Sequence, residues 1–193
     1  MNKRLLLVPL ALAPACMIAV KLGACPLHRA PSESASADER LPAYYRLFYR
    51  ARRPTGWGKR LNAAWARVYA LGALPSFLVA LETTGRRSGR GYRNALVAAD
   101  YDGQRYLVSM LGENVDWVRN VREAGGDAAI RYRGRRSVRL VEVPVEERAP
   151  IIKAYISRAR GARPHIAVDH DAPLAEFEKI APRHPVFRIE PQP

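Results

Sequence analysis

Helical spacing of apolar residues predicts four helices in the folded part of the chain. Residues 61–71 (LNAAWARVYAL) repeat apolar positions as a helix does, and Gly56-Trp57-Gly58 just before them predicts a break. Residues 116–124 (DWVRNVREA) predict a helix that ends at Gly125-Gly126. Two further helices are predicted at residues 146–157 and 174–180.

A basic aromatic segment precedes these helices. In residues 44–53 the side chains of Tyr44, Tyr45, Leu47, Phe48 and Tyr49 alternate with those of Arg46, Arg50, Arg52 and Arg53. This near-helical spacing predicts an amphipathic helix. Such a helix either packs on the domain or lies on an anionic membrane surface, and the first interpretation is slightly favoured.

Short apolar runs in the middle of the chain predict β-strands. The runs cover residues 77–82, 94–101, 105–111, 128–133, 137–143 and 186–190. Asp102-Gly103 is a strong signal for a hairpin turn, and Gly134-Arg135-Arg136 predicts a second one. Short antiparallel strands with one inserted helix predict an α+β, mainly β fold: a small β-barrel with flanking helices.

The N-terminus has the layout of a targeting segment. Residues 1–4 are basic and residues 5–20 are apolar, although Pro9 and Pro14 interrupt the run. We interpret residues 1–25 as an apolar leader, either signal-like or a membrane anchor, with a misassigned start as the alternative. Residues 26–40 form a polar linker. The folded domain is expected over residues 41–190, with helices at its N-terminal side.

Composition adds a strong preference for anions. The 193 residues include 32 lysines and arginines but only 18 acidic residues, a net charge of +14. Residues 40–93 contain twelve basic residues and a single acidic one, Glu82. Such a surface attracts nucleic acid, acidic lipid or an acidic small molecule. Both cysteines lie within the first 25 residues, which excludes a disulfide scaffold and a cysteine zinc site in the domain.

The common catalytic motifs are missing from the sequence. It has no dinucleotide fingerprint after a strand, no Walker A loop, no zinc-protease motif and no nucleophile elbow. His165 and Asp169-His170-Asp171 have residue types that bind metals, but such clusters are more often polar loops, so we expect no metal. An enzyme with this sequence therefore takes its chemistry from a cofactor.

The densest group of candidate functional residues is ETTGRRSGRGYRN, at residues 82–94. Its glycines allow a tight loop between two strands, and Arg86, Arg87, Arg90 and Arg93 place positive charge on that loop. Backbone N–H groups, hydroxyls and guanidinium groups that converge in this way bind phosphate or carboxylate. The alternative is a solvated hairpin loop. Four arginines without an acidic partner favour the anion site.

This segment, followed by RYLVSMLGENVDWVRNVREAGG, resembles the deazaflavin-dependent nitroreductase family, the F420H2-dependent quinone reductases of actinobacteria. The resemblance covers about residues 77–143 and rests on a T-T-G-R-[RK]-[ST]-G motif and a D-W-x-x-N motif. It implies a split β-barrel related to flavin-binding oxidases such as pyridoxamine-phosphate oxidase. It also implies coenzyme F420, a deazaflavin with a phospholactyl and oligoglutamate tail, and hydride transfer to a quinone-like, nitro or enone acceptor.

The resemblance also implies which residues bind the cofactor. Arg86, Arg87 and Ser88 would hold the phosphate and the acidic tail. The ring pocket would be formed by Tyr92, Arg93, Asn94, Ala95, Ser109, Met110, Leu111, Gly112, Asp116, Trp117 and Asn120. In two positions the chain departs from the family pattern. Tyr92 stands where members usually have Arg, and Ala95 where they often have Pro, so Arg93 is expected to meet the tail differently.

Two alternatives remain. A non-catalytic basic module would bind anionic lipid or nucleic acid through its charge, but it leaves residues 109–112 and Trp117 unexplained, so no specific nucleic acid partner is expected. An FMN-binding barrel is disfavoured by the number of arginines. F420 is made and reduced in the cytosol, so we expect a cytoplasmic domain, free or anchored at the cytoplasmic face of the membrane.

Overall fold

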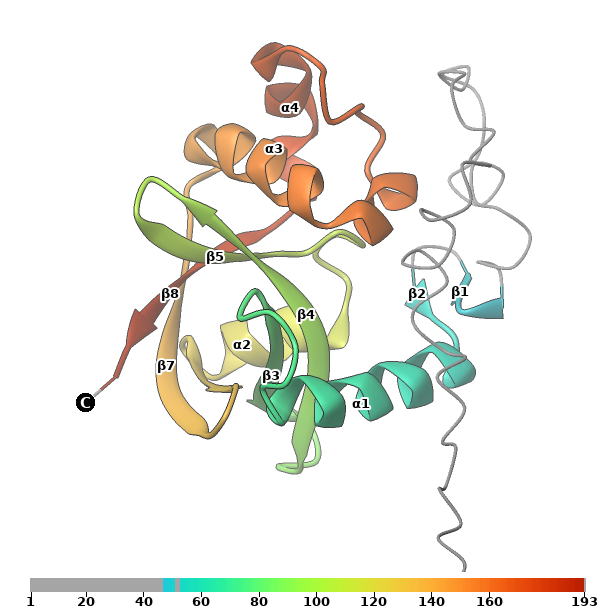
Figure 1. Ribbon diagram of the computed structural model, residues 1–193, viewed down its shortest axis with the longest axis vertical. Helices are drawn as coiled ribbons and strands as arrows, with labels where there is room; N and C mark the ends of the chain where they lie inside the picture. Colours follow the sequence, from blue (N-terminus) through green and yellow to red (C-terminus); the bar gives the residue numbers. More distant parts are fainter. Residues whose placement is uncertain (1–46, 51–52, 193) are drawn as a thin grey trace, which may run out of the picture.

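The computed structural model describes residues 47–50 and 53–192 (Figure 1). Within them, six antiparallel strands close into a barrel in the order β3-β4-β5-β8-β7-β6. The strands are β3 (Leu78–Thr84), β4 (Gly91–Tyr101), β5 (Gln104–Val108), β6 (Asp127–Arg131), β7 (Arg135–Glu142) and β8 (Val186–Pro191). This arrangement confirms the predicted α+β, mainly β class. The leader, the linker, and Tyr44 and Tyr45 lie outside the described residues, and the proposed domain boundaries remain predictions.

The helices pack on the barrel in three places. Their bounds are α1 (Gly56–Ala70), α2 (Asp116–Glu123), α3 (Arg148–Arg158) and α4 (Leu174–Ile180), with 3-10 turns η3 (Val145–Glu147), η4 (Arg160–His165) and η5 (Ala181–Arg183). Helix α1 covers β3 and β4, whereas α3 and α4 pack together at the β4, β5 and β8 side (Figure 1). Helix α2 contributes Val118 and Val121 to the core inside the barrel.

Strand β3 shows why its sequence is almost continuously apolar. Val79 and Leu81 join the core inside the barrel, while Leu78 and Ala80 pack under Ala66 and Tyr69 of α1. Because successive side chains of a strand point to opposite faces, both faces of β3 need apolar residues when a helix covers the outer one. The strand predicted at 77–82 is confirmed.

The two hairpins differ in how closely they follow the prediction. Asp102 and Gly103 have φ values of 47° and 68° and form the predicted two-residue turn. In the second hairpin, Arg135 and Arg136 belong to β7 instead of the turn. There the backbone nitrogen of Arg133 donates to Ala70 O at 3.1 Å, and its Nε donates to Gly72 O at 3.0 Å. The end of α1 therefore fixes the position of this turn.

Two predictions between residues 44 and 58 were wrong. Strand β1 (Tyr49–Arg50) pairs antiparallel with β2 (Arg53–Pro54), so Tyr49, Arg50 and Arg53 of the segment 44–53 lie in short strands instead of a helix. Gly56-Trp57-Gly58 begins α1 instead of breaking the chain. The Thr55 hydroxyl accepts from Gly58 N at 3.1 Å as an N-cap, which outweighs the low helical preference of glycine. Among the described helices, none has both the length and the apolar character needed to cross a membrane.

Candidate functional site: an arginine-rich loop between β3 and β4

The loop of residues 85–90 forms the predicted tight turn. Gly85 N donates to Arg90 O at 2.8 Å, and Gly89 N donates to Gly85 O at 2.8 Å. Gly89 has a φ of 63°, a conformation that costs glycine little and other residues more. The folded loop leaves Arg87, Ser88 and Arg90 exposed at its tip. Positive charge and a hydroxyl are thereby presented on one short loop.

Gly85 is required by a close approach at the base of the loop. A Cβ atom there would collide with the ring of Tyr92 and would lie 2.8 Å from Ser88 Oγ. The hydroxyl oxygens of Ser88 and Tyr92 lie 3.2 Å apart, within hydrogen-bonding distance. The structure thus brings the predicted residues Ser88 and Tyr92 together, with the half-exposed Tyr92 ring lying against the loop.

Helix α2 holds the other side of the loop through Asn120. The buried Asn120 accepts at Oδ1 from Arg86 N at 3.3 Å and from Arg86 Nη1 at 3.1 Å. Its Nδ2 donates to the hydroxyl of Thr83 at 3.5 Å. Because buried polar groups need partners, this contact fixes Arg86, the first arginine of the loop, against α2. Arg86 and Asn120, both predicted site residues, are in direct contact.

Asp116 links the loop to two helices. Its carboxylate lies 2.9 Å from Lys59 Nζ on α1 and 3.6 Å from Arg86 Nη1. The hydrogen bond from Lys59 is the main reason that the pKa of Asp116 lies below its ordinary range, and the charge of Arg86 adds to it. Asp116 therefore stays ionised at neutral pH and neutralises part of the charge on Arg86.

Arg93 belongs to a separate cluster around Glu82. Glu82 lies opposite Arg93 in the β3–β4 register, and its carboxylate accepts from Arg131 at 2.6 Å, Arg135 at 3.0 Å and Arg93 at 3.1 Å. Partial burial by itself would raise the pKa of Glu82, but these three hydrogen bonds outweigh it and lower the pKa to about 2. Three guanidinium groups on one carboxylate leave an excess of positive charge on this face of β3, β4, β6 and β7.

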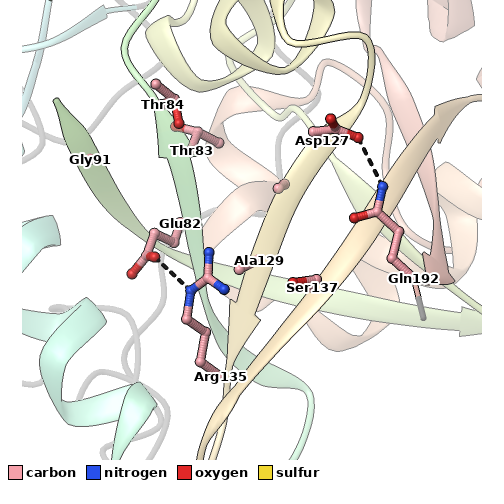
Figure 2. Close-up of a pocket in the computed structure, with 10 residues that line it drawn as sticks. Glu82, Thr83, Thr84, Gly91, Asp127, Ala129, Arg135, Ser137 and Gln192 are labelled. Atoms are coloured by element: carbon pink, nitrogen blue, oxygen red, sulfur yellow. Dashed lines mark hydrogen bonds and ion pairs between the residues drawn. The ribbon is translucent and has the colours of Figure 1, made fainter. Parts of the chain in front are cut away.

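A polar cavity of about 240 Å³ lies next to this cluster, at the base of the loop (Figure 2). Hydroxyl, amide and charged groups dominate its wall. It is lined by Glu82, Thr83, Thr84, Gly91, Asp127, Ala128, Ala129, Arg135, Ser137 and Gln192. None of these was among the predicted cofactor-binding residues, although Glu82, Thr83, Thr84 and Gly91 belong to the segment 82–94 that the sequence singled out. That segment was the available signal for the cavity, whereas Ser137 of β7 and Gln192, which follows β8, are distant in sequence.

Strand β4 is supported at Asn94 and Ala95 by an α1 residue that sequence reasoning missed. Asn62 accepts from Ala95 N at 3.1 Å and donates to Ala95 O at 3.1 Å, and Asn94 Nδ2 lies 3.4 Å from Asn62 Oδ1. On this edge β4 pairs with β5 only from Ala98 onward. The side chain of Asn62 thus takes the place of a neighbouring strand at Ala95.

The predicted residues 109–112 form a turn of their own. The hydroxyl of the buried Ser109 donates to Gly112 O at 2.6 Å, and the Ser109 carbonyl lies 2.9 Å from Nδ1 of the buried His184. Met110 packs against the core of α3 and α4, and Leu111 against the core inside the barrel. This turn is anchored on His184 instead of on the arginine-rich loop.

Trp117 lies in the core. It is 7% exposed, and its ring meets the Phe187 ring edge-on at 5.5 Å between centroids. Trp117 and Asn120 are both buried on α2, but Trp117 packs inside the barrel while Asn120 contacts the loop. The expectation that Trp117 forms a wall of a ring pocket remains a prediction.

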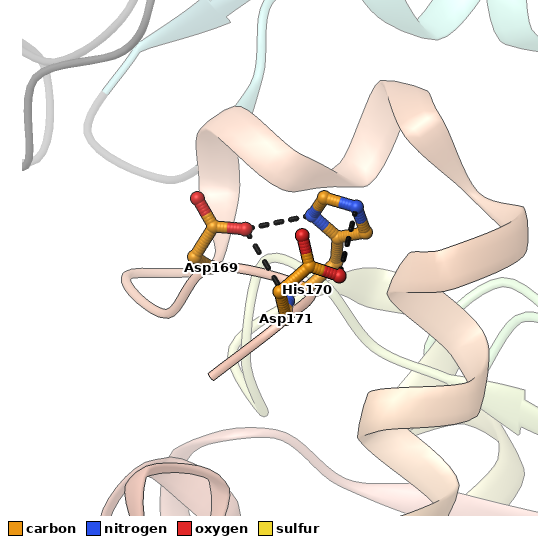
Figure 3. Close-up of side chains that lie close together, drawn as sticks. All are labelled: Asp169, His170 and Asp171. Atoms are coloured by element: carbon orange, nitrogen blue, oxygen red, sulfur yellow. Dashed lines mark hydrogen bonds and ion pairs between the residues drawn. The ribbon is translucent and has the colours of Figure 1, made fainter. Parts of the chain in front are cut away.

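Asp169, His170 and Asp171 lie close together on an exposed loop (Figure 3). His170 Nδ1 lies 2.7 Å from Asp169 Oδ1, and His170 Nε2 lies 3.3 Å from Asp171 Oδ1. Contacts within the trio account for this arrangement, and we assign it no metal.

Comparison with known proteins places the chain in a family. The profile of the F420H(2)-dependent quinone reductase family matches residues 52–163, which is more than half of the chain. No curated protein sequence matches it. The structure is also similar to a number of solved structures, of which three are described. A protein of unknown function from Agrobacterium tumefaciens strain C58 has a TM-score of 0.45 and 17% identity, over 66% of this chain and 54% of its own.

The other two are named for an activity or a ligand. The F420-H2-dependent reductase FDR-A has a TM-score of 0.42 and 24% identity, over 61% of this chain and 96% of its own. PhzG from Burkholderia lata 383, in complex with tetrahydrophenazine-1-carboxylic acid, has a TM-score of 0.38 and 16% identity, over 66% of this chain and 73% of its own. The family match confirms the resemblance drawn from the two motifs: the chain belongs to the F420H2-dependent quinone reductase family, and its cofactor is coenzyme F420.

Proposed function

We propose that this F420-dependent reductase transfers a hydride to a quinone-like, nitro or enone acceptor. The observation that carries the proposal is the loop of residues 85–90, with its three arginines and its anchor on Asn120. A quinone-like acceptor is the first choice because the family is named for it.

The residues around this loop fit an anionic cofactor. Arg87, Arg90 and Ser88 are exposed at the loop tip, and the cluster of Arg93, Arg131 and Arg135 supplies more positive charge than Glu82 neutralises. The phospholactyl group and the oligoglutamate tail of F420 carry the complementary charge. The polar cavity at the loop base offers hydroxyl and amide groups beside these arginines.

When bound, the reduced deazaflavin supplies a hydride from carbon 5 of its ring. The chain contributes binding, orientation and exclusion of water. The loop holds the phosphate end, so that the ring is positioned from a fixed point. We assign the ring to the region of Asn94 and Ala95, where Asn62 makes the strand edge rigid. Solvent can protonate a reduced quinone, so the proposal requires no protein acid.

We place the enzyme in the cytoplasm, where F420 is reduced. The leader at residues 1–25 lies outside the described residues, and anchoring through it remains a proposal. The competing non-catalytic basic module draws on the same positive charge, including the exposed Arg133 and Arg136 of the second hairpin. The third alternative, an FMN-binding barrel, is opposed by the family match.

Tryptophan fluorescence titration of the full-length chain separates the three. We expect saturable quenching by F420 that persists at high salt, with no saturable response to FMN. Oxidation of F420H2 is then followed by absorbance with a short-chain quinone, a nitroimidazole and an enone as acceptors. Saturable binding of FMN in place of F420 would support the flavin-binding barrel. Quenching by polyanions alone, lost at high salt, would support the basic module and contradict the reductase.

A further inference from the structure

The solvent side of α1 is apolar, although a helix on a protein surface normally turns polar residues outward. Trp57 and Leu71 are each 73% exposed, and Val68 is 39% exposed. Together with Leu61 and Ala64 they follow the spacing i, i+4, i+7, i+11 and i+14, which places them along one side of the helix. We call these five residues the α1 stripe.

The α1 stripe is not needed to attach the helix to the barrel. The opposite side of α1 buries Ala66 and Tyr69 against Leu78 and Ala80, and it carries Asn62 with its bonds to Ala95. Figure 1 shows α1 lying across the barrel beside β3 and β4. Exposed apolar side chains that are aligned along one helix face are typical of an interaction surface.

The charges beside the α1 stripe are of one sign. Arg60 and Arg67 lie along one flank of the helix and are exposed, and Arg53 is exposed just before it. Lys59 is paired with Asp116 and adds less. No acidic residue occurs between Arg40 and Leu81. An apolar stripe with a basic flank and an exposed tryptophan suits the interface between headgroups and acyl chains of an anionic bilayer.

From this surface we infer that the α1 stripe docks the protein on an anionic lipid bilayer, with α1 parallel to the membrane plane. A helix of 15 residues is about 22 Å long, enough to present the whole stripe at once. A second copy fits less well, because a symmetric contact would bring Arg60 and Arg67 of both copies together. The leader is also basic, with Lys3, Arg4 and Lys21, and so it does not complement the flank.

Docking would place the α1 stripe on the membrane. Asn62 lies on the other side of the same helix and holds the edge of β4 to which we assign the deazaflavin ring. A quinone dissolved in the bilayer would then be close to the enzyme that reduces it. This last step rests on the proposed function. Docking itself does not, and the two are tested by different measurements.

The test is sedimentation of the full-length protein with vesicles of phosphatidylcholine, with or without phosphatidylglycerol. We expect wild type to bind the anionic vesicles, and Trp57→Ser/Leu71→Ser to lower the partition coefficient about ten-fold. Arg60→Gln/Arg67→Gln should lower it about five-fold for each arginine, on the anionic vesicles only. All variants keep the leader, so its contribution is constant.

Two double variants serve as matched controls. Tyr101→Ser/Leu174→Ser removes two exposed large apolar side chains elsewhere, and Arg136→Gln/Arg183→Gln removes exposed arginines outside α1. Both should bind vesicles as wild type does. Wild-type binding by the Trp57→Ser/Leu71→Ser variant, or a dimer that this variant dissociates, would overturn the proposal. The Trp57→Ser/Leu71→Ser variant should bind F420 with the affinity of wild type. If wild type binds vesicles but not F420, the proposed function is contradicted and docking is supported.

Discussion

Asn120 and Arg86 are 34 positions apart, yet one side-chain oxygen of Asn120 accepts from both the backbone nitrogen and the guanidinium of Arg86. The contact joins a buried residue of α2 to the first arginine of the exposed loop. The position of the core helix α2 therefore determines the position of Arg86, an anion-binding group of the loop. A loop held in this way keeps its shape before a ligand arrives, which lowers the entropy cost of binding.

Removing this contact should weaken F420 binding. We expect Asn120→Ala to raise the Kd for F420 about ten-fold, because the loop must then be ordered by the ligand. It should also lower the free energy of unfolding by about 1–2 kcal/mol, since Arg86 loses its partner. Titration and thermal unfolding measure the two effects. Asn114→Ala, at an exposed partner of Arg119, is the control and should change neither. An unchanged Kd in Asn120→Ala would show that the loop does not depend on α2.

The backbone of the loop can be tested with two glycines that differ in conformation. A Cβ would meet no atom within 4 Å at Gly89 or at Gly56, but only Gly89 has a positive φ, of 63°. Gly89→Ala should therefore strain the loop by about 1 kcal/mol and weaken F420 binding several-fold. Gly56→Ala, at the start of α1 and outside the cavity, is the matched control and should leave binding unchanged. Equal effects of the two substitutions would contradict a role for the left-handed turn.

The Glu82 cluster should make stability depend on pH at the acid end. The pKa of Glu82 is about 2 in the folded chain, against an ordinary value of 4.5, so the unfolded chain binds the proton more tightly. The stabilisation is fully present above pH 4.5 and is lost as the pH falls toward 2. Arg93 and Arg135 are 43% and 51% exposed, and solvent screening reduces the contribution to about 1–2 kcal/mol.

Glu82→Gln should remove this dependence and leave Arg93, Arg131 and Arg135 to repel one another. We expect the variant to have a lower melting temperature than wild type at neutral pH. The difference between the two melting temperatures should shrink as the pH falls from 4.5 toward 2. Thermal unfolding from pH 7 down to the acid limit of solubility measures it. Glu178→Gln, on the exposed side of α4, is the control. A difference that stays constant with pH would contradict the lowered pKa.

The support of β4 by Asn62 predicts an effect on stability. Asn62→Ala leaves both the N–H and the C=O of Ala95 without their side-chain partner, at a cost of about 1–3 kcal/mol. Chemical denaturation at constant pH measures the loss. Gln104→Ala, exposed at the start of β5, should cost far less. Equal losses would mean that water replaces Asn62 at the strand edge.

The strands and the middle helix could be predicted because their signals are local. The continuous apolar run of β3, the turn residues Asp102-Gly103 and the glycines after α2 each act within a few positions. The errors lie where distant residues decide. Leu47 O and Phe48 O meet the hydroxyl of Thr55 and so begin α1 at Gly56, and Ala70 O fixes the turn at Arg133. Local patterns contain no information on such contacts.

The same contrast between local signals and long-range contacts holds for the candidate site. The arginines of the loop were visible as a run of charge, and the D-W-x-x-N motif pointed to Asn120. The partners of Glu82 were not visible, because Arg131 and Arg135 are 49 and 53 positions away and meet it only when β6 pairs with β3 and β7 pairs with β6. Asn62 gave no signal, since a single asparagine in a helix is usually solvated. Long-range pairing, and not residue type, was the missing information.

Strand β8 lies between β5 and β7 and completes the circle of strands. During synthesis the other five strands have emerged once residue 142 has left the ribosome, but Val186–Pro191 follows only after α3 and α4. Until then the edges of β5 and β7 are open to pairing with other chains. Closure is therefore a late event in biogenesis, and the nascent chain is most prone to misassembly during the interval in which α3 and α4 are being made.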